Sequence, residues 1–131
     1  MASRYRAEAL PGIPETLERL REAGLRLAVA TNEVRARASK ALEEAGLLPL
    51  IDVIVGVDEV ENPKPAPDVV ILACRRCATP PSEAIYIGDQ PEDLMAAEKA
   101  GVKAIGVGPR VKGMAENHVD SVGDLRVEDQ P

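Results

Sequence analysis

Polar residues that could bind a ligand or take part in a reaction follow short apolar runs at three places in the chain. Thr31 and Asn32 come first, Lys64 lies in a proline-rich segment, and Asp89 and Asp93 come third. A hydroxyl at a helix amino terminus and an ammonium group bind anions, whereas a carboxylate pair favours a hard cation such as Mg²⁺. A hydroxyl, a lysine and two carboxylates, in this order on successive strand ends, are the set that phosphoryl transfer uses.

Thr31 and Asn32 stand where a predicted strand ends and a predicted helix begins. The hydroxyl, the free backbone N–H groups and the positive end of the helix dipole converge there, which suits a phosphate. Threonine and asparagine are also common N-cap residues, and taken alone the capping role is the better interpretation. The phosphate role therefore depends on the other two places.

Lys64 lies between prolines in the segment Asn62-Pro63-Lys64-Pro65-Ala66-Pro67. Each proline fixes its own φ and disfavours the α conformation in the residue before it, so we expect a stiff, extended segment. A stiff backbone aims the ammonium group at a low entropic cost, which suits an anion clamp. A solvated lysine in a proline-rich turn fits this segment equally well.

Asp89 and Asp93 follow the apolar run 84–87, which is too short for a helix and predicts a buried strand. Asp89 at the end of a buried strand needs a partner, which favours a metal-ligand role. Asp93 has two equally good interpretations. It is the N3 carboxylate of a capping box in which Gln90 is the N-cap, or it supports the metal from the second coordination layer.

Helical and strand-like segments alternate along the chain without internal repeats. We expect helices at 14–24, from about 33 to 46, at 68–77 and at 91–101, and strands at 25–30, 51–55, 84–87, 102–107 and 119–122. This alternation predicts an α/β fold, with a parallel sheet covered by helices on both faces. Residues 1–131 should form one domain, with a lead-in at 1–11 and a polar tail at 125–131.

The composition excludes several classes of function. The chain has 131 residues and a net charge of −6, without basic clusters, which argues against binding to nucleic acid. The apolar run 69–74 is far too short for a membrane span, and Arg4, Arg6 and Glu8 occupy the place where a signal peptide would be apolar. We therefore predict a soluble cytoplasmic protein that contacts no membrane.

Cys74 and Cys77 form a lone C-x-x-C pair inside a predicted helix. A redox pair normally lies at a helix amino terminus, and a zinc site would need two further ligands, so we expect buried, reduced thiols. His118 is the only histidine and has no evident acid–base partner. We interpret it as structural or exposed.

Taken together, these residues resemble the haloacid dehalogenase (HAD) superfamily, close to its phosphoglycolate phosphatase-like branch, over residues 5–125. The matching segments are Ala28-Val29-Ala30-Thr31-Asn32, Lys64-Pro65-Ala66-Pro67-Asp68, the stretch 87–93 and the stretch 11–17. The resemblance implies a three-layer Rossmann-like core that acts on a small phosphorylated metabolite or binds inorganic phosphate. It assigns phosphate binding to Thr31, Asn32 and Lys64, a catalytic role to Lys64, and Mg²⁺ binding to Asp89 and Asp93.

The sequence departs from the family at the first motif, Asp-x-Asp-Gly-Thr, because it contains no aspartate before Asp52. The resemblance implies that this motif supplies the nucleophile and two metal contacts, so Mg²⁺ should bind weakly here. The cap domain and the central strand that carries the motif are also missing. The strands ending at Thr31 and Asp89 could then pair directly, recruit residues 1–10, borrow a strand from another copy, or remain unpaired.

Two hypotheses follow from this pattern. The chain is a truncated or degenerate HAD-like core of a Mg²⁺-dependent phosphatase for small phosphomonoesters, and is inactive alone because the nucleophile is absent. Alternatively, it is a non-catalytic phosphate-binding or interaction module, which could dimerise through an exposed sheet edge. The native substrate and any role of the two cysteines stay open.

Overall fold

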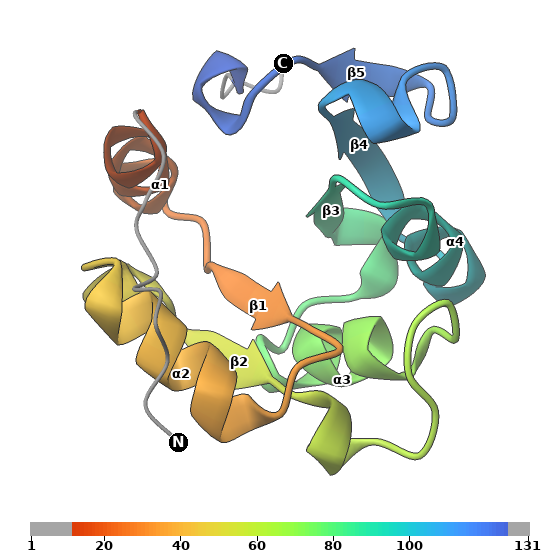
Figure 1. Ribbon diagram of the computed structural model, residues 1–131, viewed down its shortest axis with the longest axis horizontal. Helices are drawn as coiled ribbons and strands as arrows, with labels where there is room; N and C mark the ends of the chain where they lie inside the picture. Colours follow the sequence, from red (N-terminus) through yellow and green to blue (C-terminus); the bar gives the residue numbers. More distant parts are fainter. Residues whose placement is uncertain (1–11, 126–131) are drawn as a thin grey trace.

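A computed structural model describes residues 12–125 (Figure 1). Its helices are α1 (Ile13–Glu22), α2 (Arg35–Glu44), α3 (Asp68–Arg76) and α4 (Pro91–Ala100), and its strands are β1 (Ala28–Ala30), β2 (Val53–Val55), β3 (Ile85–Gly88), β4 (Lys103–Val107) and β5 (Asn117–Val119). The predicted alternation of helices and parallel strands is confirmed. The lead-in 1–11 and nearly all of the polar tail 125–131 lie outside the described residues.

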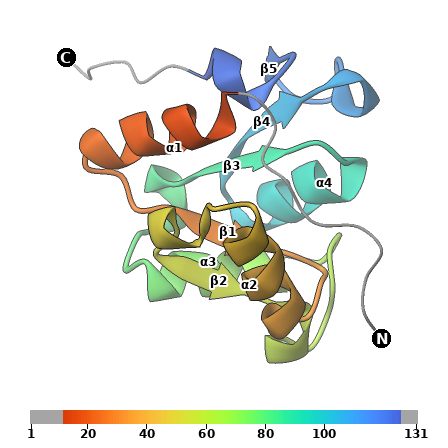
Figure 2. The same cartoon turned by 60° about the vertical axis from the view of Figure 1, so that its left-hand side comes forward.

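The strands form two separate parallel sheets instead of one. β1 pairs with β2, and β3–β4–β5 form the second sheet in that order. Figures 1 and 2 show β1 and β3 as the facing edges of the two sheets. Of the arrangements left open by the sequence, the described residues therefore adopt the one with two unpaired edges.

Several element boundaries differ from the prediction. β1 begins at Ala28 rather than at Leu25, whose side chain is half exposed beyond the end of β2. The final strand lies at Asn117–Val119, before the predicted 119–122. Ala23, just after α1, and Ala41 of α2 are exposed, so α1 and α2 each bury a narrower stripe than their apolar residues suggest.

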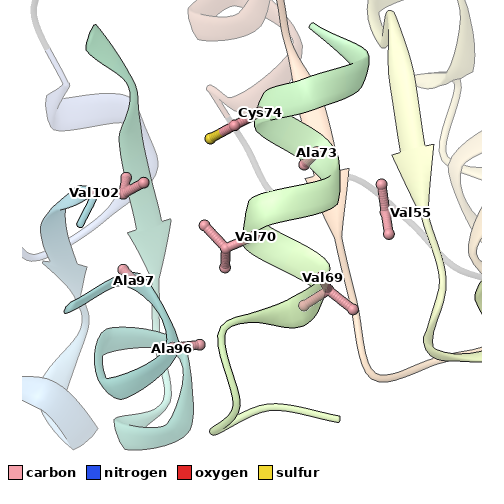
Figure 3. Packing of buried hydrophobic residues seen from close by; sticks show 8 residues of the cluster. All are labelled: Val55, Val69, Val70, Ala73, Cys74, Ala96, Ala97 and Val102. Atoms are coloured by element: carbon pink, nitrogen blue, oxygen red, sulfur yellow. The ribbon is translucent and has the colours of Figure 1, made fainter. Parts of the chain in front are cut away.

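Helix α3 connects the two sheets and forms the centre of the core (Figure 3). Val69 and Ala73 lie toward Val55 of β2, whereas Val70 and Cys74 lie toward Ala97 and Val102 on the side of the second sheet. Aliphatic residues on both flanks of one short helix thus remove apolar surface from water on both sides. The core is aliphatic, as expected for a chain without Phe or Trp.

The interpretation of the cysteines as buried and reduced is confirmed: both thiols are free and buried. Burial is the largest cause that raises the pKa of each thiol, which keeps both protonated and unreactive at neutral pH. His118 is partly buried, and its Nε2 lies 2.7 Å from the carbonyl oxygen of Gly108, which supports the structural interpretation. Within residues 12–125, no helix is long and apolar enough to cross a bilayer.

Candidate phosphate-binding site

Lys64 lies at the carboxyl end of the gap between β1 and β3. Its side chain is only 10% exposed, and Nζ donates to Asp93 Oδ1 at 2.6 Å, to the Tyr86 hydroxyl at 2.9 Å and to the Ala30 carbonyl at 3.2 Å. The alternative of a solvated lysine is therefore wrong. Because Ala30 ends β1 and Tyr86 lies in β3, one ammonium group connects both sheets.

The segment around Lys64 is a turn rather than the extended stretch that the prolines suggested. The N–H of Ala66 donates to the carbonyl of Pro63 at 2.9 Å, and the Lys64–Pro65 peptide bond is cis. The turn directs the lysine side chain inward, toward β1 and β3. The prolines restrict the backbone as expected, but in a closed conformation.

Asn32 fixes the backbone of Lys64 through both ends of its amide group. Its Oδ1 accepts from the Lys64 N–H at 2.8 Å, and its Nδ2 donates to the Lys64 carbonyl at 3.1 Å. Asn32, two residues after the end of β1, thus fixes the position of the Lys64 segment. This positioning role was not predicted, because the sequence suggests a cap or a phosphate contact for Asn32.

Thr31 is not the N-cap of α2, since that helix begins at Arg35, about two residues later than predicted, and Val34 is its N-cap residue. The Thr31 N–H extends the β1–β2 ladder by donating to Val55 at 3.0 Å, and its Oγ1 accepts from the Glu33 N–H at 3.0 Å. The hydroxyl stabilises the local turn and lies directly after β1. The capping interpretation, which seemed better from sequence, is therefore wrong.

Asp93 is buried and both of its carboxylate oxygens are engaged. Oδ2 accepts from the N–H groups of Asp89 at 3.2 Å and Gln90 at 3.1 Å, while Oδ1 accepts from Lys64. The predicted cap of α4 by Asp93 is confirmed. A side chain at Gly88 would collide with Asp93, so the close approach of α4 to β3 requires glycine there.

Asp89 is exposed at the carboxyl end of β3, so the expectation of a buried carboxylate in need of a partner is wrong. Within the described part of the chain, no group of three or more His, Cys, Asp or Glu residues is placed to hold a metal. Because Asp93 is occupied by the protein's own donors, only Asp89 of the two predicted metal ligands offers its carboxylate outward. One carboxylate fits Mg²⁺ only when waters or a substrate phosphate supply the remaining ligands.

Lys64 and Asp93 form an ion pair that outweighs the cost of burial. Burial by itself lowers the pKa of the Lys64 ammonium, but the hydrogen bonds with Asp93 and Tyr86 raise it above its usual value overall. Burial is also the largest cause that raises the pKa of Tyr86. At neutral pH the site therefore holds a charged lysine beside a neutral phenol.

Tyr86 is the component of the site that sequence reasoning missed. Its hydroxyl donates to the Ala30 carbonyl at 3.1 Å while accepting from Lys64, and its ring lies 5.6 Å from Lys64 Nζ. The sequence did contain one indication of this role: Tyr86 is the only polar side chain in an otherwise aliphatic strand, and a buried phenol usually has a hydrogen-bond partner.

Residues 2–107 match the family described as haloacid dehalogenase-like hydrolase. The chain belongs to this HAD family. It is 40% identical over 99 residues to the pyrophosphatase PpaX of Bacillus velezensis, which covers 76% of this chain and 46% of that protein. It is 32% identical over 97 residues to the phosphoglycolate phosphatase of Escherichia coli, covering 74% of this chain and 38% of that protein.

Solved HAD structures share the fold. CbbY from Rhodobacter sphaeroides in complex with phosphate is 31% identical with a TM-score of 0.79, over 88% of this chain and 55% of that chain. A HAD phosphatase from Thermococcus onnurineus is 29% identical with a TM-score of 0.80, over 87% of this chain and 54% of that chain. The chain therefore has a Rossmann-like HAD core, and it spans about half the length of these relatives.

Proposed function

We propose that this chain is the anion-binding part of a HAD-type phosphatase core, and that it binds inorganic phosphate or a small phosphomonoester without hydrolysing it. One observation carries the proposal: the ammonium group of Lys64 is held at the junction of β1 and β3, 3.2 Å from the carbonyl oxygen of Ala30, the residue before Thr31. The identity to phosphatases over three quarters of the chain supports the same class of ligand.

The anion would lie at the carboxyl ends of β1 and β3, the usual ligand position in an open α/β sheet. The Thr31 hydroxyl and the backbone N–H of Asn32 would contact it from the start of the turn after β1, because the Asn32 amide group is bound to Lys64. The Lys64 ammonium would balance its charge. Asp89 would give Mg²⁺ one ligand, so we expect weak metal binding. When bound, the metal would neutralise charge on the phosphate.

The proposed absence of turnover follows from the positions of the carboxylates. No aspartate precedes Asp52 in the sequence, and Asp93 is occupied with Lys64 and the α4 amino terminus. A HAD-type reaction needs a carboxylate that attacks phosphorus, and none of these groups is free to do so beside Thr31. The lack of a free attacking carboxylate equally favours the alternative, a dedicated non-catalytic phosphate-binding module.

Calorimetry with inorganic phosphate, together with a p-nitrophenyl phosphate assay containing Mg²⁺, tests the proposal. We expect saturable phosphate binding without turnover, and Lys64→Met should abolish the binding. Lys112→Met removes an exposed lysine elsewhere and should bind phosphate like the unmodified chain. Phosphate binding that survives Lys64→Met would refute the site, and multiple turnovers that disappear in Asp89→Ala would refute the predicted inactivity.

The DNA upstream of this sequence separates the two forms of the proposal. An in-frame Asp-x-Asp-Gly-Thr would support the core of a longer phosphatase, whereas an immediate stop codon would favour the independent module. A cytoplasmic location, the absence of nucleic-acid and membrane partners, a dimer through the sheet edge, and a single domain over residues 1–131 stay predictions.

A further inference from the structure

The outer edge of β2, which faces away from β1, has no strand neighbour within residues 12–125 (Figure 1). The N–H of Val53 and the carbonyl of Val55 bond to the residues on either side of β1, at 3.3 Å and 3.0 Å. Successive residues of a strand turn their backbone groups to opposite edges. The N–H and carbonyl of Ile54 therefore face outward.

This outer edge has a composition that suits pairing with itself. All three residues of β2 are apolar and β-branched, and an open edge of this kind is a template for another strand. Antiparallel pairing with a second copy, about a two-fold axis through Ile54, would place Val53 opposite Val55 and Asp52 opposite Gly56. Because no like charges would oppose each other, a chain that keeps this edge unpaired needs groups that block it.

Glu59 occupies the backbone of Gly56, the next residue along the chain that could extend an outward ladder. Its Oε2 accepts from the Gly56 N–H at 2.9 Å, and its own N–H donates to the Gly56 carbonyl at 3.0 Å. The hydrogen bond from Gly56 is also the largest cause that holds the pKa of Glu59 below its usual value, so the carboxylate is charged at neutral pH. One residue thus closes the carboxyl end of the edge.

Arg76, the last residue of α3, covers the outward carbonyl of Ile54. Its Nη1 donates to Glu59 Oε1 at 2.8 Å and lies 3.4 Å from the Ile54 oxygen. Arg35, at the start of α2, reaches the same Oε1 at 3.4 Å. The two arginines and residues 51–54 line a cavity of about 270 Å³ beside the edge. A partner strand would have to enter this space and displace the Arg76 guanidinium.

We propose that the Glu59–Arg76 pair closes the outer edge of β2, and that the partner it excludes is a second copy of this chain pairing through the same edge. At the amino end of the edge, the Asp52 N–H turns back to Leu27 at 2.8 Å and cannot join an outward ladder. Self-pairing therefore depends on Ile54, whose carbonyl Arg76 covers. The charge-assisted bond to Glu59 keeps the guanidinium in this position.

Arg76→Met tests the proposal, because it removes the guanidinium and keeps an unbranched stem. Sedimentation velocity should show that this variant associates as its concentration rises. In the associated form the Ile54 amide should exchange its hydrogen at least about tenfold more slowly, whereas the Val53 amide, which faces β1, should change little. In the unmodified chain, the exchange rate of the Ile54 amide should not depend on concentration.

Two further variants separate the Glu59–Arg76 pair from a general loss of surface charge. Arg75→Met is the matched control, since Arg75 precedes Arg76 in α3, is exposed and does not line the cavity. It should behave like the unmodified chain in both measurements. Glu59→Gln keeps the shape of the side chain but removes its charge, so it should also associate, and it decides the outcome if Arg76→Met does not fold.

The proposal is wrong if Arg76→Met shows the native circular dichroism but stays monomeric with unchanged exchange at Ile54. Association without slower exchange at Ile54 would also overturn it, because the contact would then lie elsewhere. Equal association of Arg75→Met would do the same. Neither Glu59 nor Arg76 lies in the phosphate site, so phosphate calorimetry on these variants should match the unmodified chain, and the two proposals can fail independently.

Discussion

The two ends of the gap between the sheets are built in opposite ways. At the carboxyl end, Lys64, Tyr86 and Asp93 form a closed polar cluster, and no buried side-chain nitrogen or oxygen within residues 12–125 lacks a hydrogen-bond partner. Further along the gap, Ile85 and Ile87 are 62% and 38% exposed. The comparison teaches that the polar end is organised by the chain's own residues, whereas the apolar remainder is left open.

Asp93→Ala should have the largest effect, because it breaks the polar end. The substitution leaves the buried Lys64 ammonium without its counter-charge, and the N–H groups of Asp89 and Gln90 lose their acceptor. We expect a loss of about 3 kcal/mol in the free energy of unfolding by urea. Asp89→Ala, an exposed carboxylate in the same turn, is the control and should cost under about 0.5 kcal/mol; equal losses would contradict the comparison.

High pH should destabilise the polar end of the gap in the unmodified chain. The folded-state pKa values of Lys64 and Tyr86 are both raised, so the folded chain holds these protons more tightly than the unfolded chain does. Their contribution is fully present below their ordinary pKa values, and is lost as the pH rises through the raised ones. Urea midpoints between about pH 8 and pH 11.5 should fall more steeply in the unmodified chain than in Lys64→Met. Parallel pH profiles would contradict this.

Tyr86→Phe should have a smaller effect, since it removes one hydroxyl and keeps the ring. Lys64 loses an acceptor and Ala30 loses one of its two donors, but Asp93 still pairs with the ammonium. We expect a loss of about 1 kcal/mol by urea denaturation. A loss as large as that of Asp93→Ala would show that the phenol, rather than the carboxylate, holds the cluster together.

Ile85→Lys should have the smallest effect on stability, which sharpens the contrast. Ile85 already exposes most of its side chain, so a charge there costs little desolvation in the chain alone. The unfolding free energy should change by less than about 0.5 kcal/mol. A large loss would show that the apolar part of the gap is closed in solution and would remove the difference between its two ends.

The sequence predicted the elements of the fold because apolar runs, glycines and prolines are local signals. The alternation of strands and helices is one such signal, and the cap of α4 depends on Gln90 and Asp93, which are only three residues apart. Thr31 was misassigned because three residues separate it from the start of α2, and helix starts are weakly marked in sequence.

The contacts that build the site could not be predicted, because they are distant in sequence. The hydrogen bonds between Asn32 and Lys64 join residues that are 32 positions apart in the sequence, and the bond from Tyr86 to Ala30 joins residues 56 positions apart. The exposure of Asp89 was also misjudged, since β3 has a strand neighbour on only one edge within residues 12–125, which leaves its end open to solvent. Pairings of this kind depend on how the two sheets face each other, which no local pattern encodes.

The phenol at the junction of the sheets also gives the chain an intrinsic optical probe. The sequence contains no tryptophan, and Tyr5 is the only other tyrosine. In a Tyr5→Phe variant, all tyrosine emission would come from Tyr86, whose hydroxyl contacts a lysine and a β1 carbonyl. The intensity of that emission would then report directly on any molecule that enters from either end.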